Sequence, residues 1–141
     1  MTALTFQMLI QCHYSGSDNN VDQLHVEQLV NGDWQVLELN NYTPGFDIFM
    51  YAILTCQHMY FRMNAAERNL ILESSEGLIT VNADEHRSIK TLHVDFKGKL
   101  KSGTVTDDAI RYINQRMRQC PVSTNLKKIM DNTTTVSFES A

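Results

Sequence analysis

The segment at residues 46–61, FDIFMYAILTCQHMYF, constrains the fold of this chain more than any other. It is apolar on nearly every face of a helix, and a helix of that kind has to be buried on all sides. Thr43 is placed to cap its first turn and Pro44 to occupy its first position, so we predict a helix from there to about Arg68. A chain of 141 residues has little material to surround such a helix. A second copy packed against it would complete the burial, so we expect a homodimer.

The residues before this helix have the pattern of strands. From Leu4 to Tyr14 the even positions are apolar and the odd positions mostly polar, as in a half-buried strand. Two further alternating runs, at 22–30 and 34–39, flank Asn31-Gly32, a pair that suits the positive φ angles of a tight hairpin turn. The first forty residues are therefore predicted to form a small antiparallel sheet.

The residues after the central helix predict a second sheet and more helices. Short strands are expected at 70–73, 78–83 and 88–97, followed by a loop at 98–103. Thr106 is the expected N-cap of a helix over 107–119, which Cys120-Pro121 ends. A short helix at 122–130 and a final strand at 133–138 follow. The predicted fold class is α+β, and the length of the chain favours one domain over residues 1–141.

Composition excludes several classes of function. The net charge is −4 and the twelve Lys and Arg residues are scattered, so we expect no nucleic-acid partner. Polar residues interrupt the most apolar segment, so we expect no membrane partner. The N-terminus, MTALTFQMLIQCHY, has no cationic start, long apolar run or cleavage site, which favours a cytoplasmic protein. Three widely spaced cysteines are neither a secreted disulfide framework nor a zinc signature, so any disulfide is expected to be transient and functional.

The cysteines are the residues that could carry chemistry. Cys12 and Cys56 lie in apolar surroundings, where a buried thiol has a raised pKa and is most simply a core residue. Cys120 comes directly before a proline that can begin a helix, and the positive end of that helix would favour a thiolate. A redox pair requires the fold to bring two thiols together, which spacing alone does not show. Cys56, His58 and Cys120 have no recognisable ligand spacing, so we expect no metal and no cofactor.

Two segments of the sequence resemble a known family. TPGFDIFMYAILTCQHM in the middle of the chain and QCPVSTNL later on resemble the OsmC/Ohr family of osmotically inducible and organic hydroperoxide resistance proteins. The resemblance spans nearly the whole chain. It implies an intertwined homodimer of α+β subunits in which a central helix carries the peroxide-reactive cysteine, here Cys56, and a Cys-Pro motif carries the resolving cysteine, here Cys120. It also implies a thiol-dependent peroxidase that reduces organic hydroperoxides in the oxidative stress response, with a dithiol as reductant.

Two differences from the family leave a second interpretation open. The peroxidases have an arginine from the N-terminal part and a glutamate near the start of the central helix, which together hold the reactive thiolate. This chain has no arginine before Arg62, and Phe46 stands at the position of the glutamate. Asp47 lies roughly opposite Cys56 on a straight helix and is better explained as a first-turn carboxylate. The alternative is a catalytically weak dimer that binds a small apolar or electrophilic, thiol-reactive ligand near Cys56.

Few residues are able to replace the missing cation. His13 and His25 lie on predicted strands, where they could face the thiols or, as is commoner for such residues, lie at the surface. His58 is two residues from Cys56 and points about 160° away on the same helix, and Arg62 also lies on another face. Four methionines on the predicted helices are expected to fill the core: Met50, Met59, Met63 and Met117.

Overall fold

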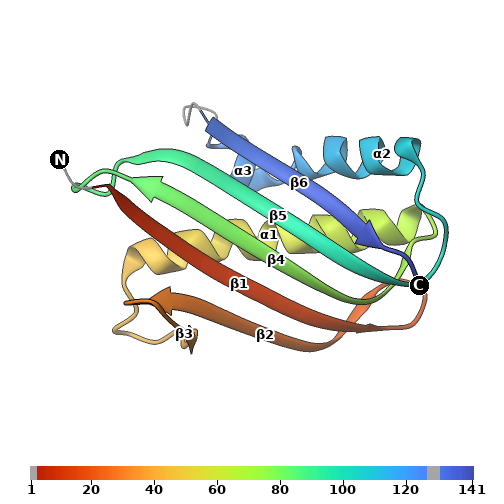
Figure 1. Cartoon of the computed structure of the whole chain (residues 1–141), viewed down its shortest axis with the longest axis horizontal. Helices are drawn as coiled ribbons and strands as arrows, with labels where there is room; N and C mark the ends of the chain where they lie inside the picture. Colours follow the sequence, from red (N-terminus) through yellow and green to blue (C-terminus); the bar gives the residue numbers. More distant parts are fainter. Residues whose placement is uncertain (1–2, 127–130) are drawn as a thin grey trace.

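The chain folds into one six-stranded sheet with three helices against one of its faces, as Figure 1 shows for a computed structural model that describes residues 3–126 and 131–141. The strands are β1 (Leu4–Ser15), β2 (Asn20–Val30), β3 (Asp33–Val36), β4 (Ile71–Ala83), β5 (Ile89–Ser102) and β6 (Asp131–Glu139). The helices are α1 (Gly45–Glu67), α2 (Asp107–Met117) and α3 (Pro121–Thr124). The order across the sheet is β3-β2-β1-β4-β5-β6, antiparallel except for the parallel pair β5–β6. The α+β class is thus confirmed.

The prediction of two separate sheets is wrong, because β1 pairs with β2 on one side and with β4 on the other. The two short strands expected at 70–73 and 78–83 are one strand, and β5 continues through the loop expected at 98–103. Glycine explains both errors. A Cβ at Gly77 would overlap the Phe96 ring, and a Cβ at Gly98 would lie 2.7 Å from Leu72 Cδ2. These glycines therefore mark close packing inside strands, not turns.

The boundaries of α1 and α2 follow the sequence closely, with one correction at the start of α1. Thr43 does not cap this helix, since its Oγ1 donates to Glu38 O at 2.9 Å and accepts from Asn40 N at 2.8 Å. Pro44 is the N-cap and gives no side-chain hydrogen bond. In α2 the prediction is confirmed, because Thr106 Oγ1 accepts from Ala109 N at 3.1 Å.

The C-terminal elements differ in length from the prediction. The helix expected at 122–130 is a single turn, α3, in the described part, and residues 127–130 lie outside the described residues. The final strand is confirmed as β6. Because β6 runs parallel to β5, the chain crosses over through α2 and α3. This crossover brings Cys120 next to Cys56 in the middle of α1.

The core lies between the sheet and the helices, where the Phe61 ring stacks on Phe96 and on Phe138. Burial of α1 on all sides does not hold within one chain. Met59 is 42% exposed and Met63 is 49% exposed, so the prediction that they fill the core is wrong. Met50 and Met117, at 2% and 0%, are core residues as expected.

Candidate functional site

Cys56 and Cys120 are joined by a disulfide, although they are 64 residues apart in sequence. Cys56 lies in the middle of α1, and Cys120 is the residue from which α3 begins, with the two Cα atoms 6.3 Å apart. The neighbouring Gln57 holds the two segments together, because its Nε2 donates to Met117 O at 3.2 Å and to Ser123 Oγ. The third cysteine, Cys12, is free and buried on β1. The structure thus brings together the two cysteines that the resemblance pairs.

The two bonded cysteines differ in access. Cys120 is fully buried, at 0% exposure, whereas Cys56 is partly exposed. It opens onto a groove of about 520 Å³ between α1, β2 and α3, which we call the Cys56 groove. Its lining residues are mostly apolar: Val21, Leu24, Ala52, Thr55, Cys56, His58, Met59, Arg62 and Val122. Of the two sulfur atoms, Cys56 Sγ is therefore the one that a molecule in the groove can reach.

Two basic side chains line the same groove as Cys56. His58 and Arg62 lie on other faces of the helix, as the spacing predicts, but the groove is wide enough to include them. Arg62 Nη1 donates to Asn19 O at 3.3 Å, and His58 Nε2 lies 2.6 Å from the Tyr14 hydroxyl. Each side chain is thus held by a hydrogen bond to another part of the chain.

A buried polar cluster lies behind His58. The Tyr14 hydroxyl is 2.6 Å from His58 Nε2 and 2.5 Å from Ser75 Oγ, which links β1, α1 and β4. Burial, with a smaller effect from the charge of Arg62, lowers the pKa of His58 to about 4. Burial also raises the pKa of Tyr14 and of the Cys12 thiol. At neutral pH the imidazole is therefore neutral and the phenol and the Cys12 thiol keep their protons, so this cluster supplies no cation to Cys56.

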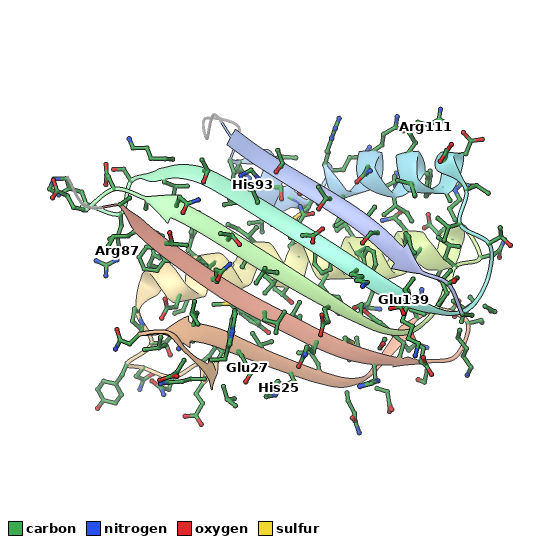
Figure 2. All side chains as sticks on the ribbon, viewed as in Figure 1. His25, Glu27, Arg87, His93, Arg111 and Glu139 are labelled. Carbon is green, nitrogen blue, oxygen red and sulfur yellow. A yellow bond between two sulfur atoms is a disulfide. The ribbon has the colours of Figure 1, made fainter. Side chains whose placement is uncertain are left out.

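The remaining candidates lie away from the cysteines. His13 is exposed and alternates with the buried Cys12, so it lies on the opposite face of the sheet from the helices. His25 is exposed as well, and Figure 2 shows it beside Glu27 on β2, with His25 Nε2 3.6 Å from Glu27 Oε1. Asp47 lies in the first turn of α1, where burial raises the pKa of its carboxyl and the charge of Arg87 opposes this. Both strand histidines are therefore surface residues, the commoner of the two expected positions, and neither faces the thiols.

Sequence reasoning missed how Gln57 and Tyr14 contribute to the surroundings of the cysteines. Gln57 and His58 are adjacent buried polar residues in a mostly apolar helix segment, and a polar residue at a buried position needs a partner. That signal was present in the sequence. Their partners Ser123 and Tyr14 come from distant segments, so only the fold identifies them.

Over residues 3–126 and 131–141, no group of three or more His, Cys, Asp or Glu side chains is close enough to hold a metal ion. None of the helices in that part of the chain has the length and apolarity needed to cross a membrane. The fold and the cysteine pair thus define an α+β protein with two thiols bonded between a central helix and a later Cys-Pro segment.

Comparison with known proteins identifies the family. The family model described as OsmC-like protein matches residues 39–135, and the chain belongs to this family. No curated protein matches the chain. Among solved structures, an OsmC-like hydroperoxide resistance protein from Jannaschia sp. CCS1 is 14% identical, with a TM-score of 0.58 over 88% of this chain and 87% of that one. An OsmC-like protein from Mycoplasma pneumoniae is 8% identical, with a TM-score of 0.53 over 83% and 89%. At these identities the structures show a shared fold.

Proposed function

We propose that this protein is an OsmC-like thiol peroxidase that reduces organic hydroperoxides through Cys56 and Cys120 and serves in the response to oxidative stress. The observation that carries the proposal is the Cys56–Cys120 disulfide, with Cys56 at the wall of an apolar groove and Cys120 buried behind it. Membership of the OsmC-like family and the hydroperoxide resistance named for the Jannaschia protein support the same role. We place the protein in the cytoplasm. We also treat residues 1–141 as one OsmC-like domain, because β1 pairs with β4, a strand inside the segment that the family model matches.

The arrangement assigns a step to each thiol. The Cys56 thiolate attacks the outer oxygen of the hydroperoxide, the O–O bond breaks, and the alcohol leaves with a proton while Cys56 becomes a sulfenic acid. The Cys120 thiol then attacks the sulfenic sulfur, releasing water and forming the disulfide. A cellular dithiol reduces the disulfide by thiol–disulfide exchange and is itself oxidised. Because Cys56 is the more accessible cysteine, it is the one assigned to peroxide.

A homodimer is part of the proposal, because α1 and β2 carry exposed apolar side chains at the groove and beyond it. On α1 and β2, five apolar side chains are more than 40% exposed: Val21, Leu24, Ile48, Met59 and Met63. Grouped exposed apolar side chains of this kind are typical of surfaces that another protein covers. A second subunit on this face would bury the outer side of α1 and close the groove around Cys56.

Arg62 is the residue that we assign to the role of the missing arginine. It lies on the wall of the Cys56 groove, so its charge favours the thiolate form of Cys56. Replacing it by glutamine is expected to raise the pKa of Cys56 and to slow the reaction with hydroperoxide by about tenfold at neutral pH. The matched control is Arg68→Gln, which removes an arginine that stacks on Tyr112 beyond the end of α1. The assignment is supported if the reaction with hydroperoxide slows in Arg62→Gln but not in Arg68→Gln, and if the rate of Arg62→Gln recovers at higher pH.

A second function fits the same groove. Its apolar lining and the bonds that engage Arg62 and His58 elsewhere also suit a catalytically weak dimer that binds a small apolar or electrophilic ligand near Cys56. The two proposals differ in whether hydroperoxide consumes thiols.

The test is a thiol count on the reduced protein before and after one equivalent of cumene hydroperoxide, with mass spectrometry to locate the disulfide. The chain has three cysteines, and we expect one free thiol, Cys12, to remain. Cys56→Ser is expected to keep all its thiols, and Cys120→Ser to stop at a Cys56 sulfenic acid that dimedone traps. Cys12→Ala is the matched control and is expected to react like the unchanged protein. Thiols that survive excess peroxide would refute the peroxidase and favour the ligand-binding function.

A further inference from the structure

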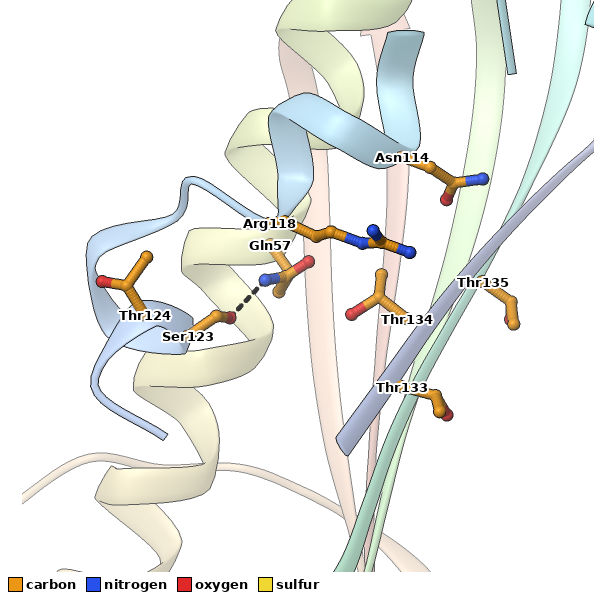
Figure 3. A pocket seen from close by; sticks show the side chains of 8 residues that line it. All are labelled: Gln57, Asn114, Arg118, Ser123, Thr124, Thr133, Thr134 and Thr135. Atoms are coloured by element: carbon orange, nitrogen blue, oxygen red, sulfur yellow. Dashed lines mark hydrogen bonds between the residues drawn. The ribbon is translucent and has the colours of Figure 1, made fainter. Parts of the chain in front are cut away.

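A pocket lined by polar residues includes Gln57, which follows Cys56 on α1. Figure 3 shows the side chains that line this pocket. Its volume is about 480 Å³, within the range of small-molecule sites and far larger than the space one water needs. Its walls are α1, α2, the α3 segment and β6, and the residues that line it are Gln57, Asn114, Arg118, Ser123, Thr124, Thr133, Thr134 and Thr135. None of these residues lines the groove around Cys56.

Gln57 presents an acceptor without a partner to this pocket. The side chain is 1% exposed, and its Nε2 donates to Met117 O at 3.2 Å and to Ser123 Oγ. A backbone carbonyl only accepts, so the nitrogen of the carboxamide has to face Met117 and the oxygen has to face the other way. Figure 3 shows that oxygen directed toward Arg118 and Thr134, and it has no hydrogen-bond partner among the described residues.

Asn114 repeats the same feature from α2. Its Oδ1 is buried and likewise has no partner in the described part of the chain. Buried polar atoms are nearly always paired, because leaving one unpaired costs free energy. Two unpaired carbonyl oxygens at one pocket therefore favour an occupant that brings N–H or O–H donors.

Arg118 sets the charge of the pocket. It is exposed, it is the one charged residue among the described residues that line the pocket, and its guanidinium extends toward Thr134 in Figure 3. A guanidinium forms its strongest hydrogen bonds with a carboxylate or a phosphate. The opposite wall is β6, an edge strand, with the hydroxyls of Thr133 and Thr135 already bonded to His93 and Asp95. Recognition therefore falls to Gln57, Asn114, Arg118 and Thr134.

We propose that this pocket binds a small molecule that carries a carboxylate for Arg118 and N–H donors for the carbonyl oxygens of Gln57 and Asn114, as an α-amino acid does. The proposal rests on unpaired acceptors and one cation in a shared cavity, and it is independent of the peroxidase chemistry. Its test involves no peroxide and is made on the oxidised protein. Failure of either proposal leaves the other standing.

The experiment is an NMR titration of the ¹⁵N-labelled protein with glycine, with acetate as a probe that carries only the carboxylate and methylammonium as one that carries only the donors. Glycine is expected to shift the side-chain amide signals of Gln57 and Asn114 and to bind about tenfold more tightly than either partial probe. Saturable glycine binding at these signals supports the site. The absence of any shift at millimolar glycine means that the pocket holds water alone and overturns the proposal.

Two variants with a matched control assign the contacts. Arg118→Gln is expected to weaken glycine binding by about tenfold, whereas Arg111→Gln, on the same helix and paired with Asp108 at 2.7 Å, leaves it unchanged. Asn114→Leu is expected to abolish binding and yet to raise the thermal midpoint, because it removes an unpaired buried oxygen. Equal binding in Arg118→Gln and Arg111→Gln, or a lowered midpoint with binding intact in Asn114→Leu, would overturn the assignment.

Discussion

Replacing Asn19 by alanine is expected to destabilise the protein by about 4 kcal/mol, although this residue sits in the turn between β1 and β2. Asn19 is 0% exposed and its side chain bonds to three backbone groups from distant segments. Its Nδ2 donates to Arg62 O and to Leu70 O, both at 3.0 Å, and its Oδ1 accepts from Leu72 N at 2.8 Å. The turn is thereby fastened to the end of α1 and the start of β4.

The magnitude has two sources. Each of the three lost hydrogen bonds leaves a backbone group without its partner, at a cost of about 1 kcal/mol each. Asn19 also has a φ of +52°, and alanine in the left-handed region costs about 1 kcal/mol more. With a urea m-value of about 2 kcal/mol per molar, typical for a small domain, the midpoint is expected to fall by about 2 M.

Asn31→Ala is the matched control, because Asn31 has nearly the same backbone angle, a φ of +51°, but is exposed in the turn between β2 and β3. It is expected to lose only about 1 kcal/mol, the backbone part. Urea unfolding of the two oxidised variants beside the unchanged protein measures the difference. Equal losses in Asn19→Ala and Asn31→Ala would show that the three bonds add nothing and would refute the reasoning.

Three further predictions concern packing, pH and assembly. Gly77→Ala is expected to cost about 3 kcal/mol because the new Cβ would overlap the Phe96 ring, whereas Gly45→Ala, with open space around it, is expected to be neutral in urea unfolding. Because the folded pKa of His58, about 4, lies below its ordinary value of 6.5, the unfolded chain takes up the proton first, so stability falls by up to about 3 kcal/mol as the pH drops through that interval. Unfolding free energies at several pH values should show a flatter slope in His58→Gln, and an unchanged slope would contradict this origin. Met59→Glu places a charge on the exposed face of α1 that the proposed dimer would cover, so we expect this variant to be a monomer by light scattering. A variant that remains a dimer would contradict the proposed interface.

Local patterns in the sequence identified most of the elements. The alternation in β1 and β2, the apolar run of α1 and the Thr106 cap of α2 each depend on neighbours a few residues apart, so the sequence alone determined them. Thr43 failed as a cap because its hydroxyl bonds within the loop before α1, to Glu38 and Asn40. A capping pattern in the sequence shows that a hydroxyl is available, but it does not identify the group with which that hydroxyl forms a hydrogen bond.

The continuity of the sheet could not be predicted, because Ser74 to Gly77 has the composition of a turn. This stretch is nevertheless a strand, since β1 and β5 pair with it on both sides and the Phe96 ring fills the space above Gly77. Pairing on two sides outweighs the low strand propensity of these residues, and both partners are distant in sequence.

The sequence by itself determined the class of fold and the elements that carry the cysteines, and the resemblance of two motifs to the OsmC/Ohr family implied the pair Cys56 and Cys120. Only the tertiary structure decided which groups surround that pair, namely Arg62 and His58 across the groove and the unpaired oxygens of Gln57 and Asn114 in the polar pocket. The physical reason is that periodicity and capping act over one or two turns of chain, whereas side chains from α1, α2, α3, β2 and β6 meet only once the sheet has closed over the helices.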